Sequence, residues 1–398
     1  MRADDFKASP TGRLVPIAGN DPQYGPWEHV AFVAHPLPGK TPALEVETFN
    51  AVADARAALA GLDRSARQLP NPALLRRPAL RREAQSTSAL EGTYAPLQDV
   101  LAAADDDDPD DANLREVLNY VRMAEHAFAW HAEGRPLALN LLTELHGLLV
   151  RGTSAATEQA GQIRDIQVVI GGHRGGRVQD ARFVPHPPGH DLNRQVREWL
   201  TWQDESSKHG MIDPVVAAAM AHYHFEVMHP FNDGNGRIGR LAIVLHFLYA
   251  NVLTEPTLTV SPWFEARRAD YYDALMAVST QGNWDRWIRF FAKGIAASAS
   301  ETEHQLTDLL KVQTSLKAKI REAGLRADNA ILLVDFALQQ PIFSIRQVER
   351  HLGVTYTRAN GLVNQLVKIG VLRQLTDATY DRPFAAPDLL AILLRGGF

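Results

Sequence analysis

The fold of this chain is decided by one stretch, His229-Pro230-Phe231-Asn232-Asp233-Gly234-Asn235-Gly236-Arg237-Ile238-Gly239-Arg240. It lies between two helical patterns, over residues 214–228 and 237–250, so its glycine-containing part is a loop that enters a helix. The first turn of a helix has unpaired N–H groups and partial positive charge, and it attracts anions. Because glycine has no Cβ, phosphate groups can approach such a loop closely. The stretch therefore predicts a phosphate-binding loop.

The side chains of this stretch favour a nucleoside triphosphate. The carboxylate of Asp233 suits Mg²⁺, a hard cation that prefers oxygen ligands and substrate phosphates. Arg237 and Arg240 lie one helical turn apart, and guanidinium groups match phosphate geometry. His229 can accept a proton near neutral pH. The candidate nucleotide-binding residues are Phe231, Asn232, Asp233, Gly234, Asn235, Gly236, Arg237 and Arg240, and among them Phe231 is expected to pack inward and anchor the loop.

Composition limits the classes of protein that fit. The chain has 398 residues, which is too long for one ordinary core, and we expect two or three domains. It contains no cysteine, which excludes disulfides, thiolate catalysis and cysteine-bound zinc. A net charge of −5 gives no general argument for nucleic acid or for an anionic membrane. No apolar run reaches the ~18 residues of a membrane span, and no signal region is evident, so we expect a cytoplasmic protein.

Periodicity predicts a mainly α protein. The first 45 residues are rich in proline and glycine and predict an extended arm or an irregular cap. Residues 105–111, an acidic run, predict a solvated loop. Further helical patterns cover residues 44–62, 76–90, 113–131, 137–149, 191–203, 271–278, 284–298 and 301–322.

One short segment has β character. Residues 166–170 are largely β-branched and precede Gly171-Gly172, and residues 182–184 then lead into a proline-rich return. This pattern predicts a β-hairpin. Arg164 lies just before it and is expected to be a surface charge.

The stretch that begins at His229 resembles the signature of the Fic family, His-Pro-Phe-x-Asp/Glu-Gly-Asn-Gly-Arg-x-x-Arg, at every fixed position. The preceding residues 221–226 and the downstream residues 271–275 and 283–288 are also similar to that family. The resemblance extends over residues 40–385 and implies a Fic-type helical bundle with a β-hairpin flap.

The resemblance implies transfer of AMP from ATP to a Ser, Thr or Tyr hydroxyl of a protein, with release of pyrophosphate. His229 would be the general base, and Asp233 would hold Mg²⁺. Asn235 and the backbone of Gly234 and Gly236 would stabilise charge on the phosphates, with help from Arg237, while Arg240 would hold the γ phosphate. Self-modification is a further expectation.

The resemblance also assigns a role to the hairpin. As a flap it would dock the target protein by edge pairing, through Gln167, Val168, Val169 and Ile170. The alternative is a hairpin that only packs on the helices. Tyr271 or Tyr272 would contact the adenine or ribose, or else belong to the core.

A second motif suggests regulation. Thr87 and Glu91 are four residues apart, on one helical face, and Gly92 follows as a helix end. An ordinary surface helix end would look the same. Self-inhibited Fic proteins, however, carry Ser/Thr-x-x-x-Glu-Gly/Asn, which implies that Glu91 pairs with Arg240 and displaces the γ phosphate. Glu91 could alternatively align water and remove AMP from a modified protein.

The C-terminal residues 326–398 follow the pattern of a winged helix-turn-helix domain, with a recognition helix at 356–369. Its polar candidates are Arg358, Asn360, Asn364, Gln365 and Lys368. DNA binding and a role in protein contacts both remain open, because this helix carries only two basic residues. A DNA-binding regulator with a nucleotide-sensing core is therefore the alternative to an enzyme.

We expect four parts along the chain. They are an N-terminal arm and helical region with the inhibitory motif (1–112), a catalytic core (113–300), a helical linker (301–325) and the winged helix (326–398). A homodimer is the expected oligomeric state.

Overall fold

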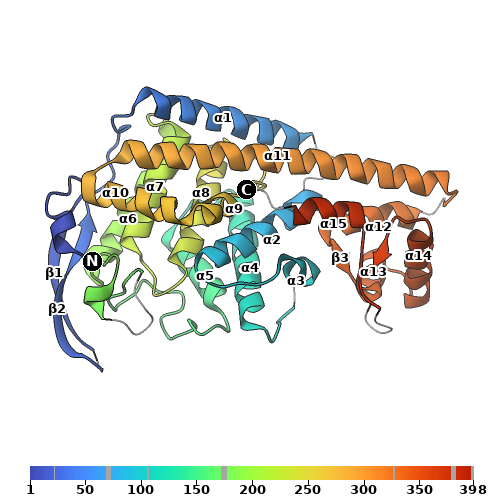
Figure 1. Cartoon of the computed structure of the whole chain (residues 1–398), viewed down its shortest axis with the longest axis horizontal. Coiled ribbons are helices and arrows are strands. Elements are labelled where there is room, and N and C mark those ends of the chain that lie inside the picture. The colour runs from blue at the N-terminus through green and yellow to red at the C-terminus, as the bar shows by residue number, and fades with distance from the viewer. Residues whose placement is uncertain are drawn as a thin grey trace. The chain divides into compact units, whose positions relative to one another are not determined.

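The computed structural model describes residues 1–21, 23–68, 73–104, 107–171, 177–325, 328–377 and 382–395. Its elements are η1 (Ala3–Phe6), β1 (Gly12–Asp21), β2 (Gly25–Ala34), α1 (Val46–Arg67), α2 (Ala73–Leu90), α3 (Leu97–Ala102), α4 (Ala112–Ala132), α5 (Leu139–Val150), η2 (Val178–Asp180), α6 (His190–His209), α7 (Pro214–Met228), α8 (Asn235–Tyr249), α9 (Ser261–Ala266), α10 (Arg268–Gln281), α11 (Trp284–Glu322), α12 (Asp328–Gln339), β3 (Ile342–Phe343), α13 (Ile345–Leu352), α14 (Tyr356–Lys368), β4 (Arg373–Gln374), β5 (Phe384–Ala385) and α15 (Pro387–Leu394) (Figure 1). The predicted mainly α architecture is confirmed.

The chain divides into two compact units, and each draws on segments that are distant in sequence. Unit 1 comprises Met1–Leu59, Asn119–Leu253 and Phe264–Ala297. Unit 2 comprises Ala60–Leu118, Thr254–Trp263 and Ser298–Phe398. The phosphate-loop stretch thus belongs to unit 1, whereas the segment with Thr87 and Glu91 belongs to unit 2.

The core of unit 1 is built on α7 and α8. Every residue of α7 except Pro214 and Glu226 is buried, and α8 is buried from Asn235 to Leu248. Helices that are apolar all round can only be central, which explains why both pack inside the unit. Asp213 caps α7 by accepting a hydrogen bond from the N–H of Val215, and Pro214 takes the first helical position.

The N-terminal segment is more regular than predicted. Instead of an irregular arm, β1 and β2 form a ten-residue antiparallel ribbon in which Gly12 pairs with Ala34 and Asp21 with Gly25. The N–H of Phe32 also donates to the carbonyl of Val184. The apolar run over residues 30–34 of β2 was the available signal, and it was obscured by the glycines and prolines around it.

The predicted flap folds back at the expected place but with little regular sheet. Among the described residues, Ile170 and Phe183 form a single antiparallel bridge, with N–H···O distances of 2.9 and 3.0 Å. Residues 172–176, which include the predicted turn residue Gly172, lie outside the described part of the chain.

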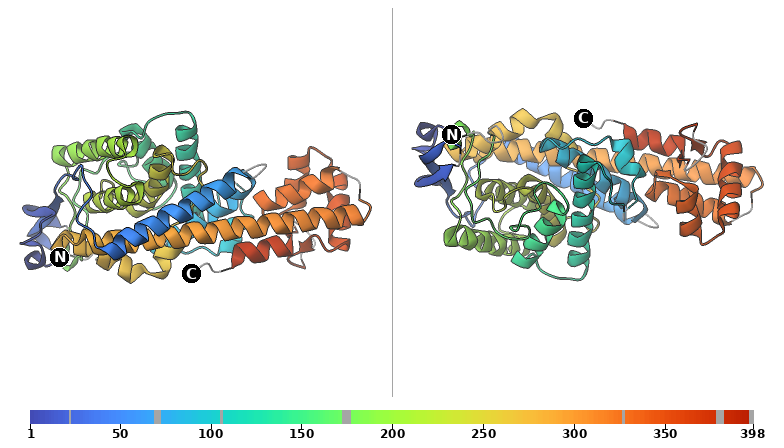
Figure 2. Two further views of the ribbon diagram at one scale, coloured as in Figure 1. Left: turned by 90° about the horizontal axis from the view of Figure 1, so that it is seen from above. Right: turned by 90° about the horizontal axis from the view of Figure 1, so that it is seen from below.

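The long C-terminal helical pattern is one element, not two. We expected separate helices over 284–298 and 301–322, but α11 runs unbroken from Trp284 to Glu322, as Figures 1 and 2 show. The junction contains alanine, serine and glutamate without glycine or proline, so nothing there ends a helix.

In unit 2, α2 is joined to the C-terminal elements. It packs against α12 and α3. Arg81 of α2 is buried and donates to the carbonyls of Val100 and Leu101 at the end of α3. Gln340, after α12, is 2% exposed and donates to the carbonyls of Leu101, Ala102, Ala103 and Ile342 at 2.8–3.3 Å. Two buried side chains therefore satisfy the helix end.

Helix α14, Tyr356–Lys368, covers all but the last residue of the helix predicted at residues 356–369. Helices α12, α13 and α14 are followed by an antiparallel sheet in the order β3-β5-β4. Ser344 forms a capping box with Gln347, and Thr355 caps α14. Residues 378–381, inside the predicted wing, lie outside the described residues.

A search of the described helices for a stretch long and apolar enough to cross a bilayer finds none.

We predict that Gln340→Leu lowers the free energy of unfolding by about 1–3 kcal/mol, because buried carbonyls at the end of α3 lose their donor. Urea denaturation followed by circular dichroism measures this change. Gln365→Leu, on the exposed face of α14, is the matched control and should change stability by less than about 0.5 kcal/mol. Equal stability losses in the two variants would contradict the capping role of Gln340.

Candidate functional site

His229 ends α7 in an unusual backbone conformation. It is the C-cap of the helix with φ 51° and ψ 62°, and its N–H donates to the carbonyl of Phe225 at 2.9 Å. This left-handed conformation costs a residue with a side chain about 1–2 kcal/mol. A strained residue that persists is held by its surroundings and often marks a functional position.

The imidazole of His229 is oriented by the helix that it ends. Its Nδ1 lies 3.2 Å from the carbonyl oxygen of Glu226. Because a carbonyl can only accept, Nδ1 carries the proton and donates it. The half-buried ring is therefore held in one orientation by the backbone of the helix that precedes it.

The loop after His229 is closed by Asn235. The Oδ1 of Asn235 accepts from the N–H of Phe231, and its Nδ2 donates to the carbonyl of Phe231, both at 2.8 Å. The side chain is 1% exposed and uses both its polar ends in the loop. The expectation that Asn235 stabilises charge on the phosphates stays a prediction, and in the structure its side chain shapes the loop.

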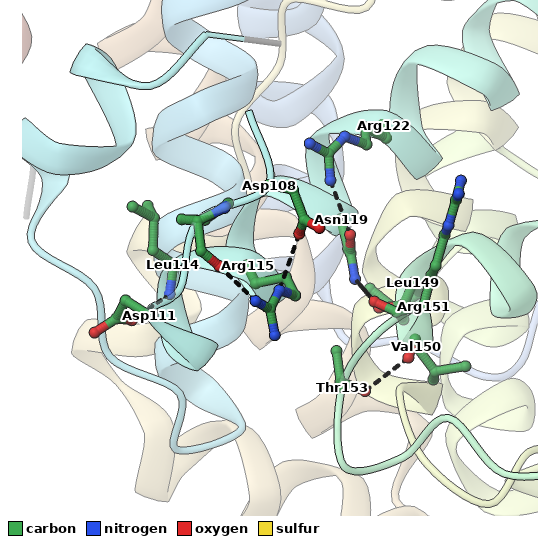
Figure 3. A network of polar contacts seen from close by, with 11 residues as sticks. Asp108, Asp111, Leu114, Arg115, Asn119, Arg122, Leu149, Val150, Arg151 and Thr153 are labelled. Atoms are coloured by element: carbon green, nitrogen blue, oxygen red, sulfur yellow. Dashed lines mark hydrogen bonds and ion pairs between the residues drawn. The ribbon is translucent and has the colours of Figure 1, made fainter. Parts of the chain in front are cut away.

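Gly234 begins α8 and lies against α5. It has φ 76°, and a Cβ at this position would come within 2.5 Å of Leu149 Cδ2. Figure 3 shows the support behind this contact, where the side chain of Asn119 points to the end of α5. Its Nδ2 donates to the carbonyls of Leu149 and Arg151 at 3.1 and 2.7 Å. Glycine is required here for both its conformation and its size.

His146 of α5 packs against the loop, and its own segment of the sequence gives no sign of this contact. Its ring stacks on Phe231 with centroids 4.4 Å apart and an interplanar angle of 13°. Its Nδ1 accepts from the N–H of Gly161 at 2.9 Å. Burial lowers the pKa of His146 to about 4, so the ring is neutral at pH 7. Phe231 is fully buried, which confirms its predicted inward packing.

The start of α8 concentrates positive charge. Gly234 is the N-cap, so the N–H groups of the next residues have no partner within the helix. Arg237 and Arg240 are 3% and 1% exposed and lie in the first two turns. Asp233 is half exposed, and its Oδ1 lies 3.1 Å from Arg237. Buried guanidinium groups beside a helix N-terminus suit polyanions, and Asp233 offers an oxygen ligand at the edge.

Arg164 was predicted to be a surface charge, and this prediction is wrong. It is 1% exposed, and its Nε donates to the carbonyl of His229 at 2.7 Å. Its other nitrogens donate to the carbonyls of Ile166, His186 and Met228. Burial lowers the pKa of Arg164 to about 10, and the guanidinium stays charged at pH 7. Nothing in the local sequence separates such an arginine from an exposed one.

Residues of the flap segment contribute to the lining of a mainly apolar pocket. Ile170 and Phe183 line it from the flap, and Glu226 and Val227 line it from the end of α7, one turn before His229. On the opposite side lie residues of α10, namely Tyr272, Leu275, Met276 and Ser279.

The structure separates the two tyrosine candidates. Tyr271 is fully buried, and its hydroxyl bonds to Nε2 of His222 at 2.8 Å, so it belongs to the core. Tyr272 lines the pocket under the flap. Among the predicted docking residues, Gln167 ties the flap to its return segment by donating to the carbonyl of Pro185 at 3.0 Å. Val168, Val169 and Ile170 are partly exposed.

The second motif ends α2 as predicted. Thr87 is fully buried, and Glu91 is exposed just beyond the last helical residue. Gly92 has φ 92°, and the N–H of Thr93 returns to the carbonyl of Ser88 at 3.0 Å. This is a glycine-terminated helix end.

Comparison with known proteins identifies two matching regions. Residues 49–129 match the family model described as Fic/DOC family N-terminal, and residues 136–247 match the model described as Fic/DOC family. The first region contains Thr87, Glu91 and Gly92, and the second contains the stretch from His229 to Arg240.

Two curated relatives are named protein adenylyltransferase fic-1. The one from Caenorhabditis briggsae is 31% identical over 166 residues, which are 42% of this chain and 29% of the relative. The one from Caenorhabditis elegans is 32% identical over 163 residues, 41% and 28% of the two chains. The matches thus cover less than a third of these relatives.

A crystal structure of a Fic family protein from Desulfovibrio desulfuricans G20 has a TM-score of 0.54 at 21% identity, over 88% of this chain and 98% of that chain. Similarity at this level shows a shared fold.

We predict that stability falls in acid partly through His146. Its pKa in the folded protein, about 4, lies below the ordinary value of 6.5, so its contribution to stability is complete above pH 6.5 and is lost as the pH falls toward 4. One such group adds about 1.4 kcal/mol per pH unit to the slope in that window. Urea unfolding at several pH values measures the slope, which should be smaller in His146→Phe by about this amount. An unchanged slope would contradict the buried neutral imidazole.

Proposed function

On the premise that the chain carries a Fic domain with its N-terminal region, we propose that it is a protein adenylyltransferase, which moves AMP from ATP to a side-chain hydroxyl of a protein. The observation that carries this proposal is the conformation of His229. Its Nδ1 lies 3.2 Å from the carbonyl oxygen of Glu226, and this contact orients the ring, whose Nε2 would serve as the base. The names of the two curated relatives support the same activity.

His229 would act as the general base. The target hydroxyl oxygen attacks the α phosphorus of ATP, and the hydroxyl proton passes to Nε2 of His229. The bond between the α phosphorus and the bridging oxygen to the β phosphorus breaks, and pyrophosphate leaves with that electron pair. A ring held in one orientation suits this step, because its nitrogen would stay aligned with the hydroxyl proton.

The start of α8 would bind the triphosphate. The N–H groups of its first turn, together with the side chains of Arg237 and Arg240, would neutralise charge that builds up on the phosphates. Asp233 would hold Mg²⁺, which supplies charge neutralisation across the phosphates. A half-exposed carboxylate at the edge of the loop fits this role, because it offers an accessible oxygen ligand to a hard cation.

The flap would hold the target protein. The partly exposed segment from Gln167 to Ile170 is fixed at both ends, by the bond from Gln167 to Pro185 and by the bridge to Phe183. A fixed extended segment can align a peptide of the target by backbone pairing. Tyr272 in the pocket below would contact the nucleoside.

Glu91 would keep the enzyme inactive. The motif Thr87-x-x-x-Glu91-Gly92 lies inside the region matched by the family's N-terminal model, and it ends a helix as the motif requires. In this proposal Glu91 pairs with Arg240, which then cannot hold the γ phosphate. ATP would bind with its α phosphate out of line, and a displacement of ~1 Å can reduce the rate about a hundredfold.

The C-terminal elements support a winged helix over residues 328–395. Their order of helix, strand, two helices and two strands fits that assignment. Two of the recognition candidates are engaged within the unit, because Asn360 accepts from Arg382 at 2.8 Å and from Asn364 at 3.3 Å. This favours a protein contact over base readout, and a gel shift with duplex DNA at several salt concentrations tests the choice.

We predict that His229→Gln lowers the rate of protein labelling by ATP about 100- to 10,000-fold, because the base is lost. Mass spectrometry after incubation with ATP and Mg²⁺ measures the addition of one AMP. Nucleotide binding should persist in the variant, since the loop is held by Asn235. His304→Gln, on the exposed face of α11, is the control. Full labelling in His229→Gln would reject the proposed mechanism.

We also predict that Glu91→Gly raises self-modification about tenfold or more, which corresponds to about 1.4 kcal/mol of barrier. The matched control is Glu133→Gly, because Glu133 precedes Gly134 at the end of α4 as Glu91 precedes Gly92 at the end of α2. The rate of self-labelling of both variants and of the unmodified protein shows whether Glu91 inhibits the reaction. If all three are labelled equally, Glu91 does not inhibit.

A further inference from the structure

Arg164 is a buried cation whose hydrogen-bond acceptors in the structure are all backbone carbonyls. Its Nε and NH2 reach the last two carbonyls of the α7 end, those of His229 at 2.7 Å and Met228 at 3.4 Å. NH1 donates to the carbonyl of Ile166 at 2.8 Å, and NH2 also donates to that of His186. The backbone N–H of Arg164 donates to the carbonyl of Pro230 at 3.0 Å.

Burial of a charged guanidinium group lowers the stability of the folded protein unless hydrogen bonds compensate. A buried guanidinium loses its hydration, and only well-placed acceptors offset that loss. The end of a helix provides them, because its last carbonyls are unpaired and carry partial negative charge. Arg164 therefore lies where α7 attracts a cation, directly on the carbonyl of His229.

We propose that Arg164 is the positioning residue of this site, which holds His229 in its left-handed conformation and fixes the flap to the same point. The catalytic consequence rests on the proposed adenylyl transfer.

The link to His229 is direct. A backbone with φ 51° at a residue with a side chain relaxes unless its neighbours oppose the change. Arg164 donates to the carbonyl of His229 itself, to that of Met228 before it and, through its backbone N–H, to that of Pro230 after it. Rotation at His229 would move these oxygens away from Arg164, and it would also break the bond from Nδ1 to Glu226 that sets the tautomer.

The link to the flap uses the same guanidinium. Ile166 lies at the start of the flap segment, and His186 lies on its return. One planar group therefore contacts three segments: the end of α7 at His229, the start of the flap at Ile166 and the return of the flap at His186. In the proposed reaction the target hydroxyl must meet all three at once. A lysine at this position has no fork and cannot reproduce that geometry.

The test uses the full chain with Glu91→Gly as the parent, so that inhibition does not mask the effect. Arg164→Lys keeps the charge, and Arg164→Gln keeps hydrogen bonding without it. We expect kcat for protein labelling to fall about a hundredfold in both, because the base is misplaced by a fraction of an ångström or more. KM for ATP should stay close to that of the parent, since Asn235 and α8 hold the phosphate loop independently. Added guanidinium ion should partly restore kcat in Arg164→Gln.

Arg81→Lys in the same parent is the matched control. Arg81 is also fully buried and also donates to carbonyls at a helix end, but those carbonyls belong to α3 in unit 2. Its replacement should cost stability without the selective loss of kcat. An equal loss of kcat in Arg81→Lys and Arg164→Lys would overturn the positioning role.

A second readout does not depend on activity. Long-range ¹H–¹⁵N spectra report the tautomer of each histidine, and His229→Gln identifies the signal of His229. The unmodified protein should show a single tautomer with the proton on Nδ1, and Arg164→Lys should show a mixture. If the parent labels no protein but this tautomer change is seen, the proposed function fails and the role of Arg164 stands.

The proposal is overturned if the Arg164 variants keep the kcat of the parent and the single tautomer. Where neither variant folds, the unmodified protein decides alone. A mixed tautomer at His229, or rapid solvent exchange of the Arg164 Nε proton, would then show that the buried contact does not hold the base.

Discussion

The exchange of two hydrogen bonds between the Asn235 side chain and the backbone of Phe231 is the constraint on which the site depends. It closes a tight loop between the last residue of one buried helix and the first turn of the next. The end of α7 carries partial negative charge and the start of α8 partial positive charge. Closing the loop keeps these opposite ends near one another, with the imidazole of His229 on the first and the guanidinium groups of Arg237 and Arg240 on the second. The amide performs this task with atoms that a ligand never needs to touch.

The charges around this loop follow one logic. Guanidinium groups are buried where unpaired backbone groups or an anionic ligand can satisfy them: Arg164 at the end of α7, and Arg237 and Arg240 at the start of α8. Histidines nearby are kept neutral by burial, as at His146, which lets them pack as flat rings. The electrostatic potential around the loop is therefore set by a few charged side chains, which apolar neighbours hold in place. This explains why the site lies on the two most buried helices of unit 1 and not on mobile loops.

Much of this arrangement could be predicted from the sequence, for reasons that are local. The limits of α7 follow from Asp213, Pro214 and the apolar run, and the loop residues follow from their glycines and charges. Two misses were non-local. Arg164 and His146 are unremarkable in their own segments and become important only through partners 65 residues and 15 residues away. The loop-closing contacts of Asn235 were not predicted for a related reason, because the sequence does not show how an amide beside such a loop packs. The β1–β2 ribbon was hidden by glycine and proline, which usually end strands but here lie within or between them.

The hydrogen bonds of Gln340 connect the C-terminal elements of unit 2 to its N-terminal helices. The helix that carries Thr87 and Glu91 shares its compact unit with the C-terminal helices, and the carbonyls of α3 receive donors from both. A shortened protein that stops before residue 328 would therefore lose part of the scaffold of α2, not just a terminal module. In evolutionary terms, the N-terminal helical region and the C-terminal elements of this chain are expected to be inherited together, since neither end can be exchanged without leaving the other with exposed apolar surface and unpaired backbone oxygens.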